Sequence, residues 1–517
     1  MLSAGRKRKL HIAALTCAVC LALCGCAPRV DFEDKDVPVE KTEVSLVLQP
    51  GETAKLDELP ALERADLSGS ECYDEIIAWQ AAHPDVEVIY TVTFPDGTTA
   101  DNSAQSLTLG AISPDDVQLT ARLAGYLPAL EELDLSGAGL SPEGAAAIAE
   151  ALPDVHIIYA CELLGQTVGL ETESLDLRGA SAAQLVAAAD VMKHLPGLKT
   201  VRLGSELENP LDWETLTALV QGCPQVDFEY GFTLYGKAFT LLDSELDLNH
   251  ITVEDGGALA YAAAGCMKNL EVLDMDFCGV SNEEMAVIRD AYPDVNVVWR
   301  IWFGDSYSVR TDAEKILASK PSAGGLVRDR DAEALKYCTK VKYLDVGHNE
   351  ILTDISFVSY MPELEVAVLA MNNIADLSPL ASCKKLEYLE IQTNARITDL
   401  SPLASCTELE HLNIANCRNF SDITPLFGLN KLKRLWLGCS APVPQEQIEE
   451  FAALHPDCEL NTTVWSDPTS EGWRVDHVDP YTNQVYYDER YEKLIEQFGY
   501  LEGDYSFASK DPKYKAG

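Results

Sequence analysis

Acidic side chains recur along the chain in one local setting, the middle position of short runs of the Leu-x-Leu type. Side chains in a strand alternate between two faces, so the middle position is predicted to point away from the apolar core. Neighbouring strands lie about 5 Å apart, and carboxylates stacked at that spacing would form a negative stripe able to attract a cationic partner. The candidate ligand-binding residues are Asp134, Asp176, Asp247, Asp274, Asp345, Glu390 and, near the C-terminal end, Trp436.

This series has two open interpretations. The acids could bind a basic protein or peptide, or they could be only the solubilising surface of a very acidic chain. An exposed Trp among polar neighbours is typical of residues that anchor interfaces, but Trp436 could instead be covered by the C-terminal tail. The chain has 83 Asp and Glu against 39 Lys and Arg, a formal net charge of -44. This balance argues against DNA or RNA as a partner, because phosphate binding depends on basic patches.

Patterns typical of catalysis, or of a metal or cofactor site, are missing from the sequence. There is no P-loop, HExxH, GxSxG or EF-hand loop, and the one CxxC motif, Cys17 to Cys20, lies in an apolar N-terminal run. His156 is predicted to share the sheet face of the acids, yet Cys161 lies five residues on, beyond the strand. We therefore expect no enzyme activity, no catalytic residue, no metal and no cofactor.

The N-terminus resembles the export signal of a bacterial lipoprotein. A basic cluster at residues 6–9 precedes an apolar run at residues 10–23, which is too short to cross a bilayer but suits a secretory signal. The run ends in Leu-Cys-Gly-Cys, similar to a lipobox. The resemblance implies removal of residues 1–25 and diacylation of Cys26, so lipid would anchor the mature chain at the extracellular face of the cell membrane. The alternatives are a plain signal peptide cut nearby and an uncleaved anchor.

The rest of the chain is built from internal repeats. LPALERADLSG, residues 59–69, recurs as LPALEELDLSG at residues 127–137. A second marker, a Pro followed by a short β-rich run, begins at Pro84, Pro153, Pro224 and Pro293, in steps of about 70 residues. Each period divides into three coils, and the coils shorten to 22 or 23 residues after Leu344. The β-rich runs after the Pro markers are aligned with the Leu-x-Leu runs by their first apolar residue. This alignment predicts that the middle, outward-pointing positions of the Pro-marked runs are Glu87, His156, Asp227, Asn296 and Glu459.

The coils share the motif LxxLxLxxN/C at a period of 20–29 residues. It is present as LEYLEIQTN from Leu386, LEHLNIANC from Leu409 and LEVLDMDFC from Leu270. On these motifs residues 59–460 resemble bacterial leucine-rich-repeat proteins; the short C-terminal coils are similar to internalin repeats and the long N-terminal coils to ribonuclease-inhibitor repeats. The resemblance implies an α/β fold: a right-handed solenoid with one continuous parallel sheet on the concave face and helices or irregular turns on the convex face.

The expected organisation has six parts. Residues 1–25 are the signal peptide, 26–43 an acidic tether and 44–58 an N-terminal cap. Residues 59–340 hold the long repeats, in a super-repeat of about 70 residues, and 341–460 the short repeats. Residues 461–517 form an aromatic-rich C-terminal cap or tail with a helix near 488–498. Whether this tail is a cap or a binding element stays open.

Polar and sulfur-bearing residues follow several strands at the point where the chain turns inward. Their side chains are predicted to hydrogen-bond buried backbone groups. They are Asn349, Asn372, Asn394, Cys278 and Cys417. Cys383 and Cys406 occupy equivalent places in successive coils and could form a disulfide or remain buried thiols. Eleven Cys remain after Cys26, an odd number that excludes a complete disulfide framework.

The function that these features favour is recognition. We expect a membrane-anchored extracellular leucine-rich-repeat protein that binds a protein or peptide through its concave face, and the acidic stripe would suit a basic partner. The alternative is a structural cell-envelope protein without a dedicated ligand, because a fold does not fix a function.

Overall fold

The computed structural model describes residues 28–304, 307–319, 326–439, 443–462, 473–482 and 484–498. The predicted signal peptide and its acceptor, Cys26, lie outside the described residues. The chain consists of two compact units, residues 1–231 and 232–517, and their boundary falls within strand β15 (Asp227–Leu234). In the part of the chain that is described, no helix combines the length and apolar character needed to span a membrane.

The first unit begins with a hairpin of β1 (Arg29–Asp31) and β2 (Asp36–Pro38). Val30, Phe32 and Val37 from this hairpin are buried in the core of the unit. The prediction of a tether over residues 26–43 is therefore wrong for residues 29–38. The tether was predicted from the many charged residues of this segment. Three apolar side chains alternate with those charges, and they suffice to pack a short hairpin against the core.

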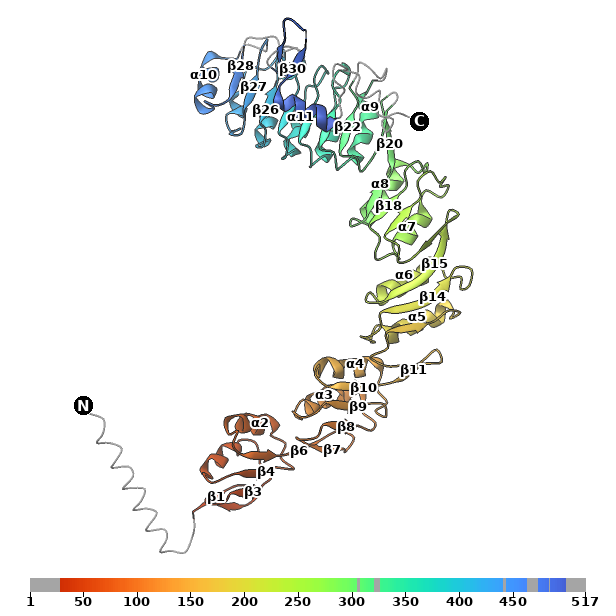
Figure 1. The fold of residues 1–517 in the computed structure, drawn as a ribbon, viewed down its shortest axis with the longest axis vertical. Coiled ribbons are helices and arrows are strands. Elements are labelled where there is room, and N and C mark those ends of the chain that lie inside the picture. Colours follow the sequence, from red (N-terminus) through yellow and green to blue (C-terminus); the bar gives the residue numbers. More distant parts are fainter. Residues whose placement is uncertain are drawn as a thin grey trace, which may run out of the picture. The chain divides into compact units, whose positions relative to one another are not determined.

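The first unit contains three groups of three parallel strands, one group per period of about 70 residues (Figure 1). Each group buries a central apolar ladder, such as Leu107, Leu133 and Ile157 in the second group. The groups are β3 (Glu43–Ser45), β4 (Arg64–Asp66) and β5 (Glu87–Ile89); β8 (Ser106–Thr108), β9 (Glu132–Asp134) and β10 (His156–Ile158); and β13 (Ser174–Asp176), β14 (Thr200–Ser205) and β15.

Helices return the chain between the parallel strands. Some of their N-termini carry side-chain caps that satisfy free backbone N–H groups: Ser141 accepts from the Gly144 amide at 3.2 Å, and Ser181 forms a capping box with Gln184. The helices are η1 (Thr53–Glu58), α2 (Tyr73–Ala82), η2 (Pro114–Asp116), α3 (Val117–Ala124), α4 (Pro142–Ala151), α5 (Ala182–Met192) and α6 (Trp213–Gly222).

The second unit holds one further group of three parallel strands and then a seven-stranded parallel sheet. The group is β17 (Glu245–Asp247), β18 (Val272–Asp274) and β19 (Asn296–Val298). The seven strands are β22 (Lys315–Leu317), β23 (Tyr343–Asp345), β24 (Val366–Val368), β25 (Tyr388–Glu390), β26 (His411–Asn413), β27 (Arg434–Trp436) and β28 (Glu459–Asn461).

Most short coils of the second unit use 3-10 helices where the longer coils use α-helices; the last short coil keeps an α-helix, α10. SPLAS segments form η5 (Ser378–Ser382) and η6 (Ser401–Ser405) in successive coils. The remaining helices are α7 (Ala258–Ala264), α8 (Asn282–Ala291), α9 (Asp329–Ala332), η3 (Glu333–Tyr337), η4 (Ser356–Tyr360), η7 (Thr424–Leu426) and α10 (Gln445–Leu454).

The prediction of one continuous sheet is wrong, because antiparallel hairpins separate the groups of parallel strands. After β5, the chain enters the hairpin of β6 (Thr91–Thr93) and β7 (Thr99–Asp101). Asn102 at its end bonds the edge of the preceding strand: its side-chain amide donates to the Val88 carbonyl at 2.9 Å and its backbone amide to the Tyr90 carbonyl at 3.0 Å. These edge groups are therefore not available to another parallel strand.

A hairpin recurs at each period, although the residue that bonds the edge of the preceding strand differs. Thr311 bonds both the amide and the carbonyl of Trp299 after β19, at 3.2 and 2.9 Å. The other hairpins are β11 (Cys161–Leu163) with β12 (Gln166–Val168), β15 with β16 (Lys237–Thr240), and β20 (Arg300–Phe303) with β21 (Tyr307–Arg310).

The predicted polar ladder at the inward turn is confirmed. Asn394 donates from Nδ2 to the carbonyls of Leu369 and Ile391 at 3.0 and 2.9 Å, and its Oδ1 accepts from the Ile374 amide at 3.0 Å. Cys278 and Cys417 take the same place, each donating its thiol to a carbonyl of the preceding coil, at 3.1 and 3.3 Å. Buried backbone groups that the turns leave unpaired are thus satisfied.

Cys383 and Cys406 are free, buried thiols and not a disulfide. Each thiol lies within hydrogen-bonding distance of a carbonyl of the coil before it, Val358 at 3.7 Å and Leu380 at 3.4 Å. Burial raises the pKa of Cys383 to about 11 and that of Cys406 to about 12. Both therefore remain protonated and poorly nucleophilic near neutral pH.

The C-terminal segment, residues 473–482 and 484–498, contains β29 (Val475–Val478), β30 (Val485–Tyr487) and α11 (Glu489–Phe498). The helix predicted near residues 488–498 is confirmed. Figure 1 shows α11 running across the strands of the seven-stranded sheet. Side-chain contacts of Gln497 with Tyr343 of β23, and of Arg490 with Tyr388 of β25, establish that it lies on the sheet.

Candidate functional site

The outward-pointing row of the parallel strands differs from the predicted row at every Pro-marked coil. Ala65 pairs with Val88, so Ile89 and not Glu87 lies beside Asp66. The reason is that Val86 belongs to a turn, where its amide donates to the His83 carbonyl at 3.1 Å. The residues that take the places of Glu87, His156, Asp227, Asn296 and Glu459 are Ile89, Ile158, Glu229, Val298 and Asn461.

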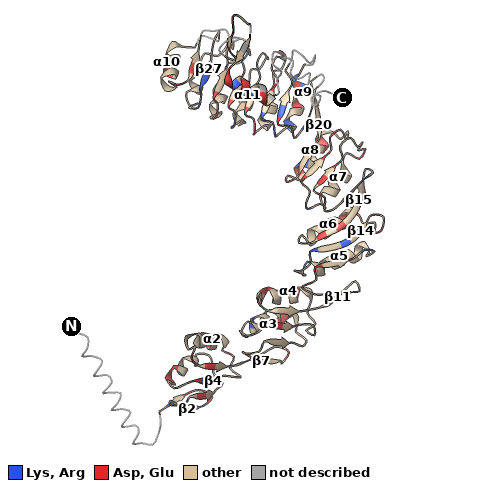
Figure 2. Cartoon of the chain, in the orientation of Figure 1, with Lys and Arg blue, Asp and Glu red and all other residues tan. Residues whose placement is uncertain are grey.

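In the first unit the outward face of the strands is open to solvent and acidic. Asp176 and Arg202 are exposed, and Asp134 and Glu229 are partly exposed. Figure 2 shows acidic residues on β4 and β15 and a basic residue on β14. The shifted residues Glu87, Asp227 and His156 remain on this face, one row away, because alternate residues of a strand share a face.

Ion pairs offset part of the negative charge of this face. Arg178 pairs with Asp176 at 2.7 Å, and Arg202 with Glu229 at 3.0 Å. The hydrogen bonds from Arg178 lower the pKa of Asp176 to about 2. The Asp134 carboxylate accepts from the Ser136 amide at 2.8 Å, and hydrogen bonding by Ser136 lowers the pKa of Asp134. Both predicted site residues are therefore ionised at neutral pH.

In the second unit the predicted acids Asp247 and Asp274 are paired. Asp247 binds Lys237 at 2.7 Å, and Asp274 binds Arg310 at 2.8 Å. Asp274 is only 9% exposed, so the expectation that it points into water is wrong. Arg310 belongs to the hairpin of β20 and β21. Its ion pair with Asp274 could not be predicted from the pattern of the parallel strands.

The short coils differ most from the prediction, because their candidate residues are buried. Asp345, Glu390 and Trp436 are 3%, 0% and 1% exposed. Asp345 accepts from the Gly347 amide at 3.0 Å, while the C-terminal segment covers Glu390 and Trp436. The interpretation of Trp436 as covered by the tail is therefore confirmed, and the interpretation of Glu390 and Trp436 as exposed ligand-binding residues is wrong for the chain in this state.

Glu390 is the centre of the contact between sheet and C-terminal segment. Its carboxylate accepts from Nε of Arg474 at 2.9 Å and from Nε1 of Trp473 at 2.9 Å, and Nη2 of Arg474 also donates to it. From the sheet itself, the Tyr388 hydroxyl and Nε2 of Gln392 donate to the same carboxylate. Burial raises the pKa of Glu390, but Arg474 and the other donors outweigh that effect and leave the pKa below its usual value.

Aromatic rings surround this ion pair. The Trp473 ring packs at 5.6 Å from Trp436 and at 5.7 Å from Tyr388, measured between ring centroids. The Arg474 guanidinium lies over the Tyr491 ring of α11 at 5.0 Å. Cation–aromatic contacts of this kind strengthen when they are shielded from water.

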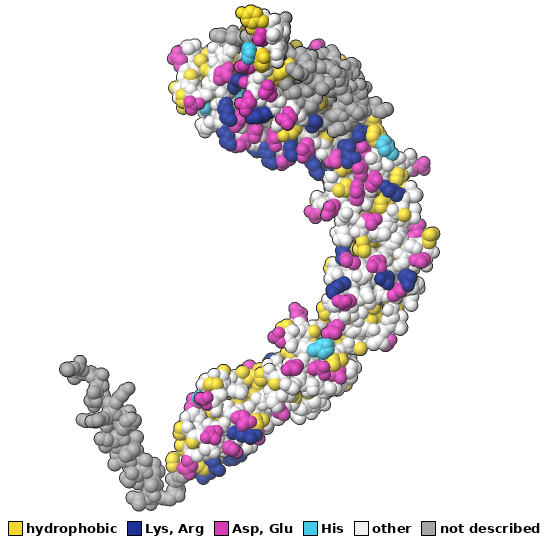
Figure 3. Space-filling view, viewed as in Figure 1, with side chains coloured by type: hydrophobic (Ala, Val, Ile, Leu, Met, Phe, Trp, Pro, Cys, Tyr) yellow, Lys and Arg dark blue, Asp and Glu magenta, His cyan; other side chains and the backbone are white. Residues whose placement is uncertain are grey.

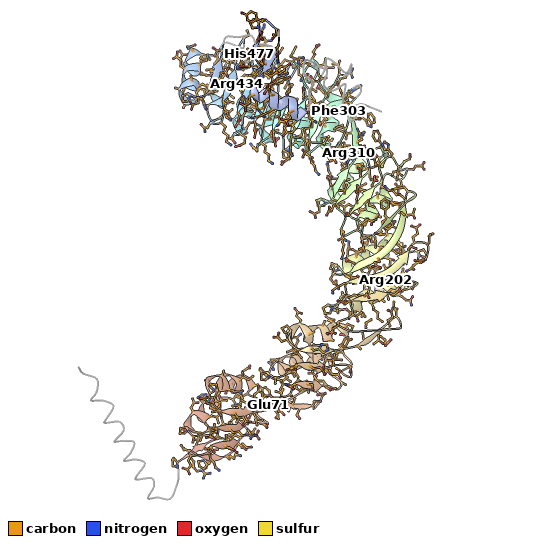
Figure 4. All side chains as sticks on the ribbon, in the orientation of Figure 1. Glu71, Arg202, Phe303, Arg310, Arg434 and His477 are labelled. Carbon is orange, nitrogen blue, oxygen red and sulfur yellow. The ribbon has the colours of Figure 1, made fainter. Side chains whose placement is uncertain are left out.

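Further contacts fix α11 along the sheet. Arg434 of β27 binds Asp488 at 3.1 Å and donates to the Trp473 carbonyl at 3.2 Å (Arg434 and His477 are labelled in Figure 4). At the other end, Nε2 of Gln497 donates to the Tyr343 hydroxyl at 3.4 Å. The C-terminal segment thus covers the face of the sheet, where the sequence suggested a cap or tail without specifying its place.

Two leucine-rich-repeat family models match parts of the chain. A model of two leucine-rich-repeat copies matches residues 362–405, and a model of one repeat matches residues 126–149 and 337–355. No curated protein sequence is significantly similar to the chain. Together with the parallel strands and the Asn and Cys ladder, the matched repeats confirm the leucine-rich-repeat fold.

Several solved bacterial structures are similar at low identity. An internalin (inlF) from Listeria monocytogenes is 16% identical, covering 72% of this chain and 86% of its own, with a TM-score of 0.24. A leucine-rich-repeat protein from Leptospira interrogans is 15% identical, covering 80% and 93%, with a TM-score of 0.24. The functional domain of InlJ from Listeria monocytogenes, described as including a cysteine ladder, is 13% identical, covering 70% and 65%, with a TM-score of 0.24.

His411, on β26 beneath the C-terminal segment, makes stability depend on pH. Burial, together with the nearby Arg434 and Arg490 guanidinium groups, lowers its pKa to about 4. Unfolding restores a pKa of about 6.5, so the unfolded chain binds the proton more tightly and stability falls as the pH drops from about 6.5 towards 4.

We expect His411 to lower the free energy of unfolding of the second unit by about 2 kcal/mol between pH 7 and pH 5. His411→Gln should remove this share of the loss, because glutamine does not titrate. Urea denaturation at the two pH values measures the difference. An equal loss in the variant and the wild type would show that His411 is not held neutral under the segment.

Proposed function

We propose that the chain is a recognition module that binds a protein or peptide through the open sheet face of its first unit. The observation that carries this proposal is the exposure of charged side chains on that face, in contrast to the covered face of the short coils. The leucine-rich-repeat fold supports it, since such repeats typically mediate protein interactions. A structural envelope protein would not need this difference between the two faces.

The charge of the open face favours a basic partner. Eight acids and two arginines lie in its two outward rows, and all are exposed or partly exposed. The acids are Glu43, Asp66, Glu87, Glu132, Asp134, Asp176, Asp227 and Glu229, and the arginines are Arg64 and Arg202. Attraction between exposed charges is screened over about 8 Å at 0.15 M salt and about 30 Å at 0.01 M salt.

The acidic face is tested by selecting random displayed peptides on the immobilised full chain. We expect the selected peptides to be rich in Lys and Arg and to bind more weakly at 0.15 M than at 0.01 M salt. Neutralising four acids of the face should weaken binding about tenfold or more, because it removes half of the carboxylates that attract a basic partner. The changes are Glu132→Gln, Asp134→Asn, Asp176→Asn and Glu229→Gln.

A matched control removes four exposed acids from the helical side of the same unit. These changes are Glu143→Gln, Glu150→Gln, Asp154→Asn and Glu214→Gln, which alter the net charge by the same amount. The control should retain binding. Equal losses in both variants would mean that only net charge matters, and peptides with no basic bias would contradict the proposal.

We also propose that lipid on Cys26 holds the module on the outer face of a bacterial membrane. The N-terminal resemblance supports this placement. Cys26→Ser should move the protein from the membrane fraction to the soluble fraction, because stable attachment needs more than one acyl chain. Membrane sedimentation and mass spectrometry of the N-terminus measure the attachment. Lipid anchoring would be ruled out if the variant still sediments with membranes and the wild-type N-terminus carries no lipid.

A further inference from the structure

The covered face of the short coils has the composition of a recognition site. We define the Glu390 slot as Tyr388, Glu390, Gln392, His411 and Trp436, the sheet residues around Trp473 and Arg474 of the C-terminal segment. Its base is a carboxylate with no exposed surface, and its walls are aromatic. Sealing a sheet does not require a buried ion pair, because well-packed apolar residues serve as well or better.

Polar atoms in the slot are left unpaired by the C-terminal segment. Nε1 of Trp436 and Oε1 of Gln392 are buried without a hydrogen-bond partner among the described residues, and so is Nδ1 of His411. Trp436 and Gln392 are 1% and 0% exposed. Each such group costs stability, so a permanent cover should match it. The C-terminal segment satisfies the charge of the slot but not these atoms.

We propose that the Glu390 slot is a binding site for a peptide of another protein that carries an arginine next to an aromatic residue, and that Trp473 and Arg474 occupy it in the free chain. This proposal goes beyond the acidic face of the first unit and does not depend on it. The chain's own segment shows the chemistry that the slot accepts. A foreign peptide that also pairs with Trp436 and Gln392 would displace the segment.

The geometry favours arginine over lysine. Nε and Nη2 of Arg474 both donate to Glu390, one to each carboxylate oxygen, and a lysine ammonium cannot reproduce this planar fork. The aromatic neighbour is selected by Trp436 and Tyr388 on one side and by the Arg434 guanidinium, 5.7 Å from the Trp473 ring, on the other. Both requirements fall on adjacent residues of the ligand.

The test uses the full chain and two labelled synthetic peptides. The first peptide has the sequence of residues 473–479, WRVDHVD, and the second replaces its arginine by neutral citrulline. Fluorescence anisotropy measures binding to the wild type, to Arg474→Ala and to Trp473→Ala, two variants that weaken the chain's own hold on the slot. Circular dichroism checks that each variant is folded, and either folded variant is sufficient.

We call the folded Arg474→Ala or Trp473→Ala protein the opened variant. The arginine peptide should bind the opened variant at least about tenfold more tightly than it binds the wild type, because the chain's own segment competes for the slot in the wild type. The citrulline peptide should bind about tenfold more weakly or worse, and adding Glu390→Gln should abolish the difference between peptides. Neutralising the four acids of the first unit should leave this binding unchanged. Equal binding of both peptides, or no binding to a folded opened variant, would overturn the proposal and leave the slot as an internal dock only.

Discussion

Glu390→Ala should lower the free energy of unfolding of the second unit by about 3–5 kcal/mol. The change leaves the Arg474 guanidinium buried without its counter-charge and deprives Nε1 of Trp473 of its acceptor. Denaturation by urea, followed by tryptophan fluorescence, measures the loss, because Trp436 and Trp473 pack at this contact.

Glu363→Ala is the matched control for this prediction. Ion pairs on the surface join successive short coils, such as Lys385 with Glu363 at 2.5 Å, and Figure 3 shows basic and acidic side chains interleaved over this region. Both partners of that pair are about half exposed, at 54% and 41%, so its loss should cost less than about 1 kcal/mol. If Glu390→Ala lowers the free energy of unfolding no more than Glu363→Ala does, the buried contact at Glu390 is contradicted.

Removing both charges should cost less than removing one. In Glu390→Met with Arg474→Met no unpaired charge remains, and apolar side chains of similar length fill the space. The double variant should therefore recover much of the loss caused by Glu390→Ala. If it is the less stable of the two, the ion pair contributes more than its burial costs.

Asn394→Ala should lower the free energy of unfolding by about 2–4 kcal/mol, the second large effect that we expect. The side chain makes three hydrogen bonds to buried backbone groups of Leu369, Ile391 and Ile374, all of which lose their partner in the variant. Asn430→Ala, at an exposed loop position, is the control and should change stability little. If both variants lower the free energy of unfolding only slightly and by the same amount, water replaces the hydrogen bonds of the Asn394 side chain.

The periodic part of the architecture could be predicted from the sequence because it is local. Leucines of each coil contact their equivalents in the next, so packing repeats with the motif, and the turn that exposes backbone carbonyls recurs with Asn394 or Cys417 beside it. The breaks in the sheet could not be predicted in the same way. They depend on single residues such as Asn102, whose bonds to the preceding strand have no repeated pattern.

The candidate site was predicted only in part, for a related reason. Asp134 and Asp176 are on an open face as expected, whereas Glu390 holds the equivalent position of its own strand in a different sheet and is fully buried. The difference comes from Arg474, 84 residues away in the chain and outside any repeat. Two features of the sequence indicated that the face of the short coils differs: Trp436 replaces an acid in the series, and an aromatic-rich tail follows. Neither feature identified the arginine that pairs with Glu390.

Hydroxyl-radical footprinting of the unmodified chain tests most directly whether the C-terminal segment covers the short coils. Trp299 and Trp302 are internal standards, at 2% and 47% exposure. We expect Trp436 and Trp473, at 1% and 2%, to be oxidised as slowly as Trp299. Oxidation of both at the rate of Trp302 would contradict the covered face and would return Trp436 to the set of exposed binding residues.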